Sequence, residues 1–224
     1  MYGLDAKHTI GRRIAKRGIS SFIDHVSNLR EQLTSFLAFY RRSVLDNSGL
    51  KRAGVLIPIF EKNDEPYFLL TRRTQDVEHH KGQISFPGGS VDGGDRDIVG
   101  TALRETQEEI GLAPEFVDVL GLFNDLTIPT GFVVTPVVGF LTSVPALKLN
   151  VTEVDSVFEA PFSFFREPGN RKVVAMTRGG QTRDVYFFTF GEYEIWGATA
   201  FMIDSFLKEL VGHSQQFPSD RALS

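Results

Sequence analysis

The chain carries the stretch Arg104-Glu105-Thr106-Gln107-Glu108-Glu109-Ile110-Gly111-Leu112, in which three acids share one side of a predicted helix. At 3.6 residues per turn, Glu105, Glu108 and Glu109 stand at positions i, i+3 and i+4 and are therefore neighbours. Like charges at this spacing destabilise an isolated helix by about 0.2–0.5 kcal/mol per pair. A cation bound among them would reverse that effect, and carboxylate oxygens suit the hard ions Mg²⁺ and Mn²⁺.

The helix that carries these acids is predicted over residues 97–110. Asp95 or Asp97 is expected to be its N-cap, and Gly111, with Pro114 shortly after, is expected to end it. Its apolar stripe consists of Ile98, Val99, Ala102, Leu103, Thr106 and Ile110. The glutamates project about a quarter-turn from that stripe, so the helix is expected to bury one face and leave the acids in a cleft at the edge of the core.

Upstream of this helix, the pattern of apolar residues predicts an N-terminal helix and then a hairpin. Apolar residues recur at three- and four-residue steps over residues 20–45, and a break follows near 46–49. Two short apolar runs, 53–60 and 66–72, are separated by a polar turn, as in a β-hairpin. A polar loop is then expected at 74–83, and a brief strand ending in a tight turn at 85–89.

Downstream of the acidic helix, more strands and two helices are expected. Strands are predicted at 116–123, 132–141, 153–158, 171–178 and 185–190, and helices at 161–165 and 197–211. Strands on both sides of a central helix, with a helix at the end, favour a single mixed α/β sandwich domain over residues 20–211. A basic segment, residues 1–19, precedes this domain, and a polar tail, residues 212–224, follows it.

The composition excludes several classes of protein. The 224 residues are 42% hydrophobic and 23% charged, as in an ordinary globular protein, and the net charge of −4 favours neither nucleic-acid binding nor attachment to an anionic membrane. The absence of cysteine excludes disulfides, thiolate metal sites and a cysteine nucleophile. No apolar run approaches the ~20 residues that a membrane span requires. No secretory core follows the basic start, so a cytoplasmic location is expected, with organellar targeting as the alternative.

The region Gly89-x₅-Asp95-x₈-Arg104-Glu105-Thr106-Gln107-Glu108-Glu109-Ile110-Gly111-Leu112 resembles the Nudix box, whose usual form is Gly-x₅-Glu-x₇-Arg-Glu-U-x-Glu-Glu-x-Gly-U, with U an aliphatic residue. Two departures lie upstream of the helix: Asp95 stands where Glu is usual, and one extra residue separates it from Arg104. A third is Thr106 at the first U position. The helical phase of the three glutamates is unchanged by all of them.

A second resemblance covers residues 69–89. The pattern Leu69-Leu70-Thr71-x-Arg73-Thr74-x₃-Glu78-x₃-Gly82-x₃-Phe86-Pro87-Gly88-Gly89 is similar to the signature of the coenzyme A pyrophosphatase branch of the Nudix hydrolases. That branch usually carries Ser or Ala at Thr74, which is a small change, and Arg at Glu78, which exchanges a cation for an anion. Residues 195–200 are also similar to members of that branch, whereas the N-terminal helix lies outside these motifs.

These resemblances imply a Nudix-type α/β/α sandwich that cleaves a diphosphate with the help of Mg²⁺ or Mn²⁺. Glu105, Glu108 and Glu109 would hold the ions, which neutralise the substrate's charge and lower the pKa of a bound water. Gly88 and Gly89 would allow the backbone to approach the metal–phosphate complex closely, and the carbonyl of Gly89 is a candidate ligand.

Several other side chains have more than one possible role. Arg104 would hold a glutamate in place, meet a phosphate oxygen or serve as a surface ion-pair partner. Arg73 would contact a phosphate or remain an exposed arginine at a strand end. Glu153 would act as a general base or an extra ligand, or be a plain acid at the edge of a strand. Trp196 is expected in the core, with contact to a base or to an apolar arm of the substrate as the alternative, and His79 and His80 are expected to be loop residues.

The leading functional hypothesis is hydrolysis of coenzyme A, or of its acyl derivatives, to 4′-phosphopantetheine (or its acyl form) and adenosine 3′,5′-bisphosphate. The alternative, kept open by Glu78, is hydrolysis of another nucleoside diphosphate derivative such as ADP-ribose, NADH or a nucleotide sugar. A Nudix-fold ligand-binding or regulatory domain without activity is the third hypothesis. The expected partner is a small diphosphate, and the sequence leaves homo-oligomerisation open.

Overall fold

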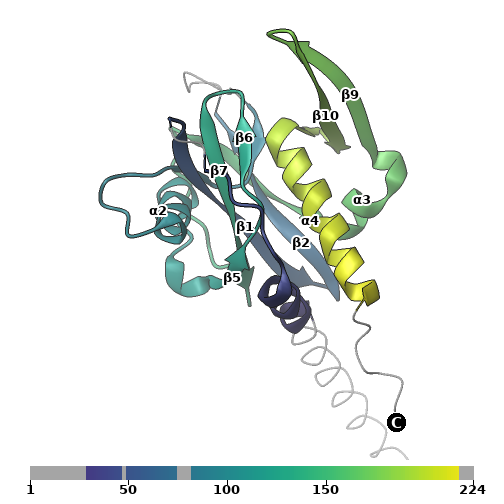
Figure 1. Ribbon diagram of the computed structural model, residues 1–224. Helices are drawn as coiled ribbons and strands as arrows, with labels where there is room; N and C mark the ends of the chain where they lie inside the picture. The colour runs from purple at the N-terminus through teal and green to yellow at the C-terminus, as the bar shows by residue number, and fades with distance from the viewer. Residues whose placement is uncertain (1–28, 47–48, 75–81, 217–224) are drawn as a thin grey trace, which may run out of the picture.

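The computed structural model describes residues 29–46, 49–74 and 82–216 (Figure 1). The basic segment 1–19, the first part of the predicted N-terminal helix, and His79 and His80 lie outside the described residues. Within them, an N-terminal helix runs over residues 29–39 and so ends six residues before the expected limit.

The early end of this helix has a visible cause. The backbone N–H of Ser43 donates to Asn124 Oδ1 at 2.7 Å, and that of Leu45 donates to Asp125 Oδ2 at 3.0 Å. These side chains satisfy backbone donors that a helix would otherwise have satisfied internally. Residues 40–46 therefore run extended beside the segment that contains residues 124 and 125.

The hairpin predicted after the break is present as β1 (Lys51–Lys62) and β2 (Glu65–Arg73). Its turn residues Asn63 and Asp64 have positive φ angles of 55° and 61°, as expected of a tight hairpin turn. β1 pairs in parallel with β7 (Phe132–Leu141), whereas the other pairs in the main sheet are antiparallel. This combination makes the sheet mixed.

Two short strands occupy the space where β1 and β2 separate. β3 (Ile84–Ser85) pairs with the end of β2, and β4 (Gly88–Ser90) pairs with the start of β1. Gly88 has a φ of 149°, and a Cβ at this position would lie 2.4 Å from the carbonyl oxygen of Gly54. Only glycine fits this close approach, and the turn into β4 is thereby held against β1.

The remaining elements follow in chain order. They are α2 (Ile98–Ile110), the 3₁₀ turn Pro114–Phe116, β5 (Asp118–Leu122), β6 (Leu126–Ile128), β8 (Val154–Pro161), α3 (Phe162–Arg166), the 3₁₀ turn Pro168–Asn170, β9 (Arg171–Arg178), β10 (Gln181–Phe190), β11 (Tyr193–Trp196) and α4 (Gly197–Gln216). The main sheet has the order β3-β2-β1-β7-β5, with β4, β6 and β8 paired to β1, β7 and β2, and a second sheet has the order β11-β10-β9.

Helices cover both faces of the main sheet, which is an α/β/α sandwich (Figure 1). On one face, α2 buries Ala102 and Ile110 against sheet residues such as Leu56. On the other, the N-terminal helix, α3 and α4 pack over a core rich in phenylalanine, including Phe36, Phe68, Phe86, Phe123, Phe140, Phe162, Phe165 and Phe206. Neighbouring residues along each strand serve opposite faces, and the predicted fold class is confirmed.

Several element limits differ from the sequence expectation. α4 continues to Gln216, so the first five residues of the expected polar tail are helical. β10 begins at Gln181 rather than 185, because Gly179 and Gly180, with φ angles of 58° and 78°, form a tight turn that pairs it with β9. The strand expected from 116 begins at Asp118, after a 3₁₀ turn.

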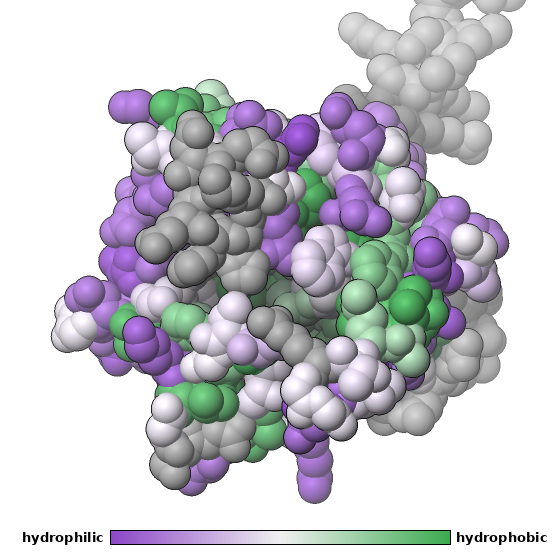
Figure 2. Space-filling model, turned by 90° about the horizontal axis from the view of Figure 1, so that it is seen from above, coloured by the Kyte–Doolittle hydropathy of each residue, from purple (hydrophilic) through white to green (hydrophobic). Residues whose placement is uncertain are grey.

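Trp196 was expected in the core, and this expectation is wrong. Its side chain is 39% exposed at the end of β11. Seen from above, the molecule is hollowed near its centre, and hydrophobic residues gather on one side of the hollow (Figure 2). No helix in the described parts of the chain is both long enough and apolar enough to cross a membrane.

Candidate functional site

The acidic helix α2 has well-defined ends. Asp97 is its N-cap, and its side chain accepts a hydrogen bond from the backbone N–H of Gly100 at 2.8 Å. Gly111 closes the helix with a φ of 70° and donates its backbone N–H to the carbonyl of Gln107 at 2.9 Å. Both features match the local signals in the sequence, and together they fix the phase of the three glutamates.

Glu109 is the most buried of the three, with only 3% of its surface exposed. Its Oε2 accepts a hydrogen bond from the backbone N–H of Gly88 at 3.1 Å, and its Oε1 lies 3.4 Å from a guanidinium nitrogen of Arg73. Burial raises the pKa of Glu109 to about 7, against the opposing effects of Gly88 and Arg73. The metal-free protein therefore holds a carboxyl group that is partly protonated near neutral pH.

Glu105 lies against the other glycine of the turn. A Cβ built at Gly89 would be 2.4 Å from the carboxyl carbon of Glu105, so only a glycine lets the backbone come this close. Burial raises the pKa of Glu105, although the neighbouring Arg104 acts in the opposite direction. Glu105 and Glu109 thus both face the Gly88–Gly89 turn from one side of α2.

Glu108 has a different environment. Its side chain is 58% exposed, and Arg104 donates to Glu108 Oε2 at 3.0 Å. The three glutamates therefore do not share one cleft equally: two are enclosed by the glycine turn, and the third lies at the surface beside an arginine.

Glu153 joins the buried pair from another part of the chain. It stands in the turn just before β8, and its charge raises the pKa of both Glu105 and Glu109. Asn150 donates its side-chain N–H to Glu153 Oε1 at 3.2 Å. A carboxylate that lies close enough to repel two others is well placed as an additional ligand or a base.

Comparison with known proteins agrees with this geometry. A family profile described as NUDIX domain matches residues 50–144. A protein named Uncharacterized Nudix hydrolase NudL, from Photorhabdus laumondii, is 38% identical over 160 residues, which cover 71% of this chain and 85% of the relative. The protein of the same name from Klebsiella pneumoniae is 35% identical over 180 residues, or 80% of this chain and 93% of the relative. The chain belongs to the Nudix hydrolase family.

The name of these relatives states no substrate. Among solved structures, a MutT/nudix family protein from Enterococcus faecalis gives a TM-score of 0.48 at 18% identity, covering 85% of this chain and 73% of that chain. The Nudix fold of this chain is seen in its own mixed sheet, covered by α2 on one face and by the N- and C-terminal helices on the other.

In this Nudix hydrolase, Arg104 is held by a residue that the sequence suggested only as a cap. Asp95 accepts hydrogen bonds from Arg104 Nε at 2.8 Å and from a terminal nitrogen at 3.0 Å, and it also accepts from Thr101 Oγ1 at 2.8 Å. The Arg104 guanidinium holds the pKa of Asp95 well below its usual range. The extra residue in the loop signalled a local change, but it did not identify this pairing.

Arg104 uses its remaining donors within the same cluster. One terminal nitrogen donates to the carbonyl of Ser90 at 3.1 Å, and the other lies 3.0 Å from both Glu105 Oε1 and Glu108 Oε2. A guanidinium engaged on all sides is suited to holding Glu105 in place, which favours the first of its predicted roles over direct contact with a phosphate.

Arg73 offers a donor that the described residues do not use. Its Nε is buried and has no hydrogen-bond partner among the described residues, while a terminal nitrogen contacts Glu109. A buried, unsatisfied donor costs free energy, about 1–3 kcal/mol for an uncharged group and more for a charged one. A substrate oxygen would satisfy this N–H.

The donor set of this Nudix hydrolase fits a hard divalent ion. Among the described residues, no three acidic, histidine or cysteine side chains are already grouped closely enough to hold an ion by themselves. The Gly88–Gly89 backbone and two desolvated carboxylates nevertheless form a cradle that a Cβ would fill. Carboxylate and carbonyl oxygens are the donors that Mg²⁺ and Mn²⁺ prefer, and a bound cation would offset the cost of burying two negative charges.

Proposed function

We propose that this chain is a metal-dependent diphosphatase that converts coenzyme A, or its acyl derivatives, to 4′-phosphopantetheine (or its acyl form) and adenosine 3′,5′-bisphosphate. One relationship supports this most. Arg73 and Gly88 belong to the pattern that resembles the coenzyme A pyrophosphatase signature, and both contact Glu109 of the Nudix box. Residues from both of these overlapping motifs thus meet at one carboxylate.

The chemistry follows from the proposed roles of these residues. Glu105 and Glu109, with Glu108, Glu153 and the carbonyl of Gly89 as further donors, would hold Mg²⁺ or Mn²⁺. When bound, the ion neutralises charge on the diphosphate and lowers the pKa of an attacking water. Glu153 would serve either as such a ligand or as the general base that accepts the proton of that water.

The two arginines have different tasks in this proposal. Arg104, held by Asp95, keeps Glu105 turned toward the glycine turn. Arg73 donates its Nε–H to a phosphate oxygen and so orients the substrate, since a charge-assisted hydrogen bond is stronger than a neutral one. Gly88 and Gly89 let the phosphates approach the backbone.

Glu78 is the specific observation that favours a second substrate class. It is an anion where the coenzyme A pyrophosphatase branch usually has a cation, and it lies outside the described residues. Loss of a phosphate contact at this position would suit a substrate without the 3′-phosphate of coenzyme A, such as ADP-ribose or NADH. The non-enzymatic reading is disfavoured because the chain keeps all three glutamates of the box.

The test is a panel of diphosphates incubated with the purified protein and Mg²⁺ or Mn²⁺ in ¹⁸O-labelled water. Product masses then give both the substrate and the phosphorus that is attacked. We expect coenzyme A to be cleaved fastest. Intact coenzyme A alongside cleaved ADP-ribose or NADH would refute this substrate, and no cleavage of any member with either metal would refute an enzymatic role.

The same assay tests the site. Glu105→Gln and Glu109→Gln should each lower kcat by at least about 10²-fold, as expected when a group that stabilises the transition-state charge is lost. Glu115→Gln, at an exposed glutamate of the 3₁₀ turn after α2, is the matched control and should keep full activity. Unchanged activity of the Glu109→Gln variant would refute the proposed site.

A further inference from the structure

A cavity of about 310 Å³ lies at the end of β2, on the side of the strand away from Glu109. Its lining residues are mostly polar: Arg72, Gly82, Gln83, Ile84, Glu192, Tyr193, Glu194 and Trp196. They come from β2, from the segment that enters β3, and from β11 with the turn before it. None of them has a part in the proposed metal site.

The cavity and that site are nevertheless linked through the backbone of neighbouring residues. The backbone N–H of Arg73, whose side chain contacts Glu109, donates to the carbonyl of Gln83 at 3.0 Å. Successive side chains of a strand point to opposite faces, so Arg73 turns toward α2 while Arg72 lines the cavity. From Ile84 at the cavity to Gly88 at the carboxylates, an extended chain spans only about 13 Å.

Trp196 gives the cavity a flat aromatic surface. Its ring stacks on that of Phe187, its cross-strand partner, with centroids 6.1 Å apart and an interplanar angle of 11°. Although supported in this way, the Trp196 side chain remains 39% exposed. A large aromatic ring that is held in place and still exposed to solvent is suited to stacking against a nucleobase.

The polar groups around this ring are mainly hydrogen-bond acceptors. Glu194 lies two residues from Trp196 in β11 and therefore on the same face of the strand. Glu192 and Gln83 add further oxygens, and the one cation of the lining, Arg72, lies 3.9 Å from Glu192 and 3.9 Å from Asp155. Carboxylates attract an amino group and repel a phosphate. The cavity therefore suits a base, and the neighbourhood of Arg73 suits the phosphates.

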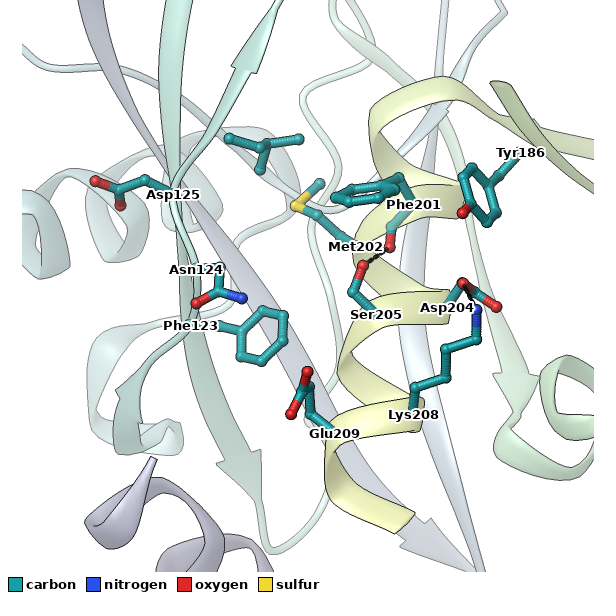
Figure 3. A pocket seen from close by; sticks show the side chains of 11 residues that line it. Phe123, Asn124, Asp125, Tyr186, Phe201, Met202, Asp204, Ser205, Lys208 and Glu209 are labelled. Atoms are coloured by element: carbon teal, nitrogen blue, oxygen red, sulfur yellow. Dashed lines mark hydrogen bonds and ion pairs between the residues drawn. The ribbon is translucent and has the colours of Figure 1, made fainter. Parts of the chain in front are cut away.

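A second cavity, of about 280 Å³, provides a comparison with the first. It lies between α4 and the segment Phe123–Leu126 (Figure 3), and Asp125 points away from it. Several of its polar groups are already engaged: Asp204 pairs with Lys208 at 2.7 Å, and Ser205 donates to the carbonyl of Phe201 at 2.5 Å. Among the described residues, none of those that line it contacts the Glu109 side chain, so we assign it no ligand.

We propose that the cavity at Trp196 binds the base of the substrate, an adenine-type ring that stacks on Trp196 and donates its amino group to Glu194. This inference rests on the proposed function, because it places the nucleoside side of the diphosphate at β11 and the anhydride at the Gly88–Gly89 turn. Glu194 makes the cavity selective for a base with an amino group over one with a carbonyl at the same position.

Trp196 is the only tryptophan in the chain, so its fluorescence reports directly on the cavity. The experiment titrates the full-length protein, without metal, with adenosine 3′,5′-bisphosphate, AMP and IMP, none of which contains the anhydride to be cleaved. We expect saturable quenching by the two adenine nucleotides and at least about tenfold weaker binding of IMP. Absence of quenching, or equal affinity for AMP and IMP, would overturn the proposal.

Variants separate stacking from hydrogen bonding. Equilibrium dialysis should show about tenfold weaker AMP binding for Trp196→Ala and near wild-type binding for Trp196→Phe, which keeps an aromatic ring. Glu194→Gln should reduce the preference for AMP over IMP to less than about threefold. Phe201→Ala removes an aromatic ring that is 42% exposed at the other cavity and should leave AMP binding unchanged.

Binding and catalysis can fail separately in this design. A protein that cleaves coenzyme A but binds AMP equally well with and without the Trp196 ring retains its proposed function and overturns the inference about the cavity. A protein whose AMP binding depends on Trp196 and Glu194 but which cleaves no diphosphate supports the cavity and refutes the proposed function.

Discussion

Glu109 accepts a hydrogen bond from the backbone N–H of Gly88 at 3.1 Å, which joins the Nudix helix to the glycine turn of the neighbouring strand. This bond and the nearby Arg73 favour the charged carboxylate, but burial outweighs them and the pKa rises to about 7. The most enclosed acid of the proposed site is thus the one whose charge is most costly without a metal.

We expect the stability of the metal-free protein to fall as the pH rises from about 5 to about 8. The pKa of Glu109 is raised from 4.5 to about 7, so between these values the folded protein retains a proton that the unfolded chain has lost. This contribution is complete below the unfolded pKa and is lost as the pH passes through the folded one, at most on the order of 3 kcal/mol. Urea unfolding at both pH values measures it.

Glu109→Gln is the control for this titration. It should remove the pH-dependent difference attributed to Glu109 and make the metal-free protein more stable than wild type at about pH 8. Excess Mg²⁺ should stabilise the wild type at that pH and the variant much less, and removal of the ion with EDTA should abolish activity. A wild-type stability that rises over this range would contradict the raised pKa.

Gly89→Ala should abolish most activity while leaving the protein folded. The new Cβ would lie 2.4 Å from the Glu105 carboxyl carbon, and the far end of a side chain can move aside more readily than backbone. Glu105 would be displaced from the turn, so we expect kcat to fall at least about 10²-fold. Gly93→Ala, where nothing lies within 4 Å, is the matched control. Equal activity of the two variants would show that the close approach has no catalytic role.

Asp95→Asn should lower kcat more than it raises KM, because Asp95 acts by holding Arg104 rather than by contacting the substrate. An amide weakens the pairing and frees the guanidinium to move Glu105. Since the pKa of Asp95 is lowered, the stability it contributes is present above its unfolded pKa and is lost only as the pH falls below about 4. Steady-state kinetics of Asp95→Asn test this role, with Asp97→Asn as the control because asparagine is also a good N-cap. An equal loss of kcat in both variants would show that the effect comes from the start of the helix and not from the pairing with Arg104.

Asp125→Ala should be strongly destabilising. The side chain is completely buried and contacts Arg42 at 2.9 Å, Thr135 Oγ1 at 2.7 Å and the backbone N–H of Leu45 at 3.0 Å. Removing one partner of a buried charge cluster costs about 3–5 kcal/mol, which urea unfolding can measure. Asp118→Ala, at an exposed ion pair with Arg30, should cost less than about 1 kcal/mol. Similar losses in both would mean that the Asp125 cluster adds little.

The parts of the fold that the sequence predicted well are those specified by local signals. The hairpin of β1 and β2 followed from two apolar runs around a polar turn, and α2 followed from its stripe, Asp97 and Gly111. Caps, turns and periodicity involve only a few neighbouring residues, so they can be recognised without knowing the tertiary packing.

The arrangement of the site depended on contacts that no local pattern contains. Helical phase placed Glu105, Glu108 and Glu109 together, but it could not show that Glu108 remains 58% exposed while Glu109 is buried. That difference arises because the turn into β4 covers one side of α2. Asp95 pairs with Arg104 through a loop whose path the spacing did not reveal.

Sequence patterns also missed features that depend on tertiary contacts, namely the short strand β6 and the exposure of Trp196. β6 has only three residues, which is too short for alternation to be recognised, and it exists because it pairs with β7. Trp196 was expected to be buried because large aromatic rings usually are. Its partial exposure follows from its place at the end of β11, where the cavity lies.

The loop that precedes the acidic helix forms a small turn of its own at residues 92–95. Asp95 donates its backbone N–H to the carbonyl of Asp92 at 3.0 Å, and its side chain accepts the N–H of Asp92 at 2.8 Å. This turn ends before the cap at Asp97, so it does not affect the angular placement of the residues of α2. The loop before the acidic helix can therefore change in length without moving the carboxylates that follow it.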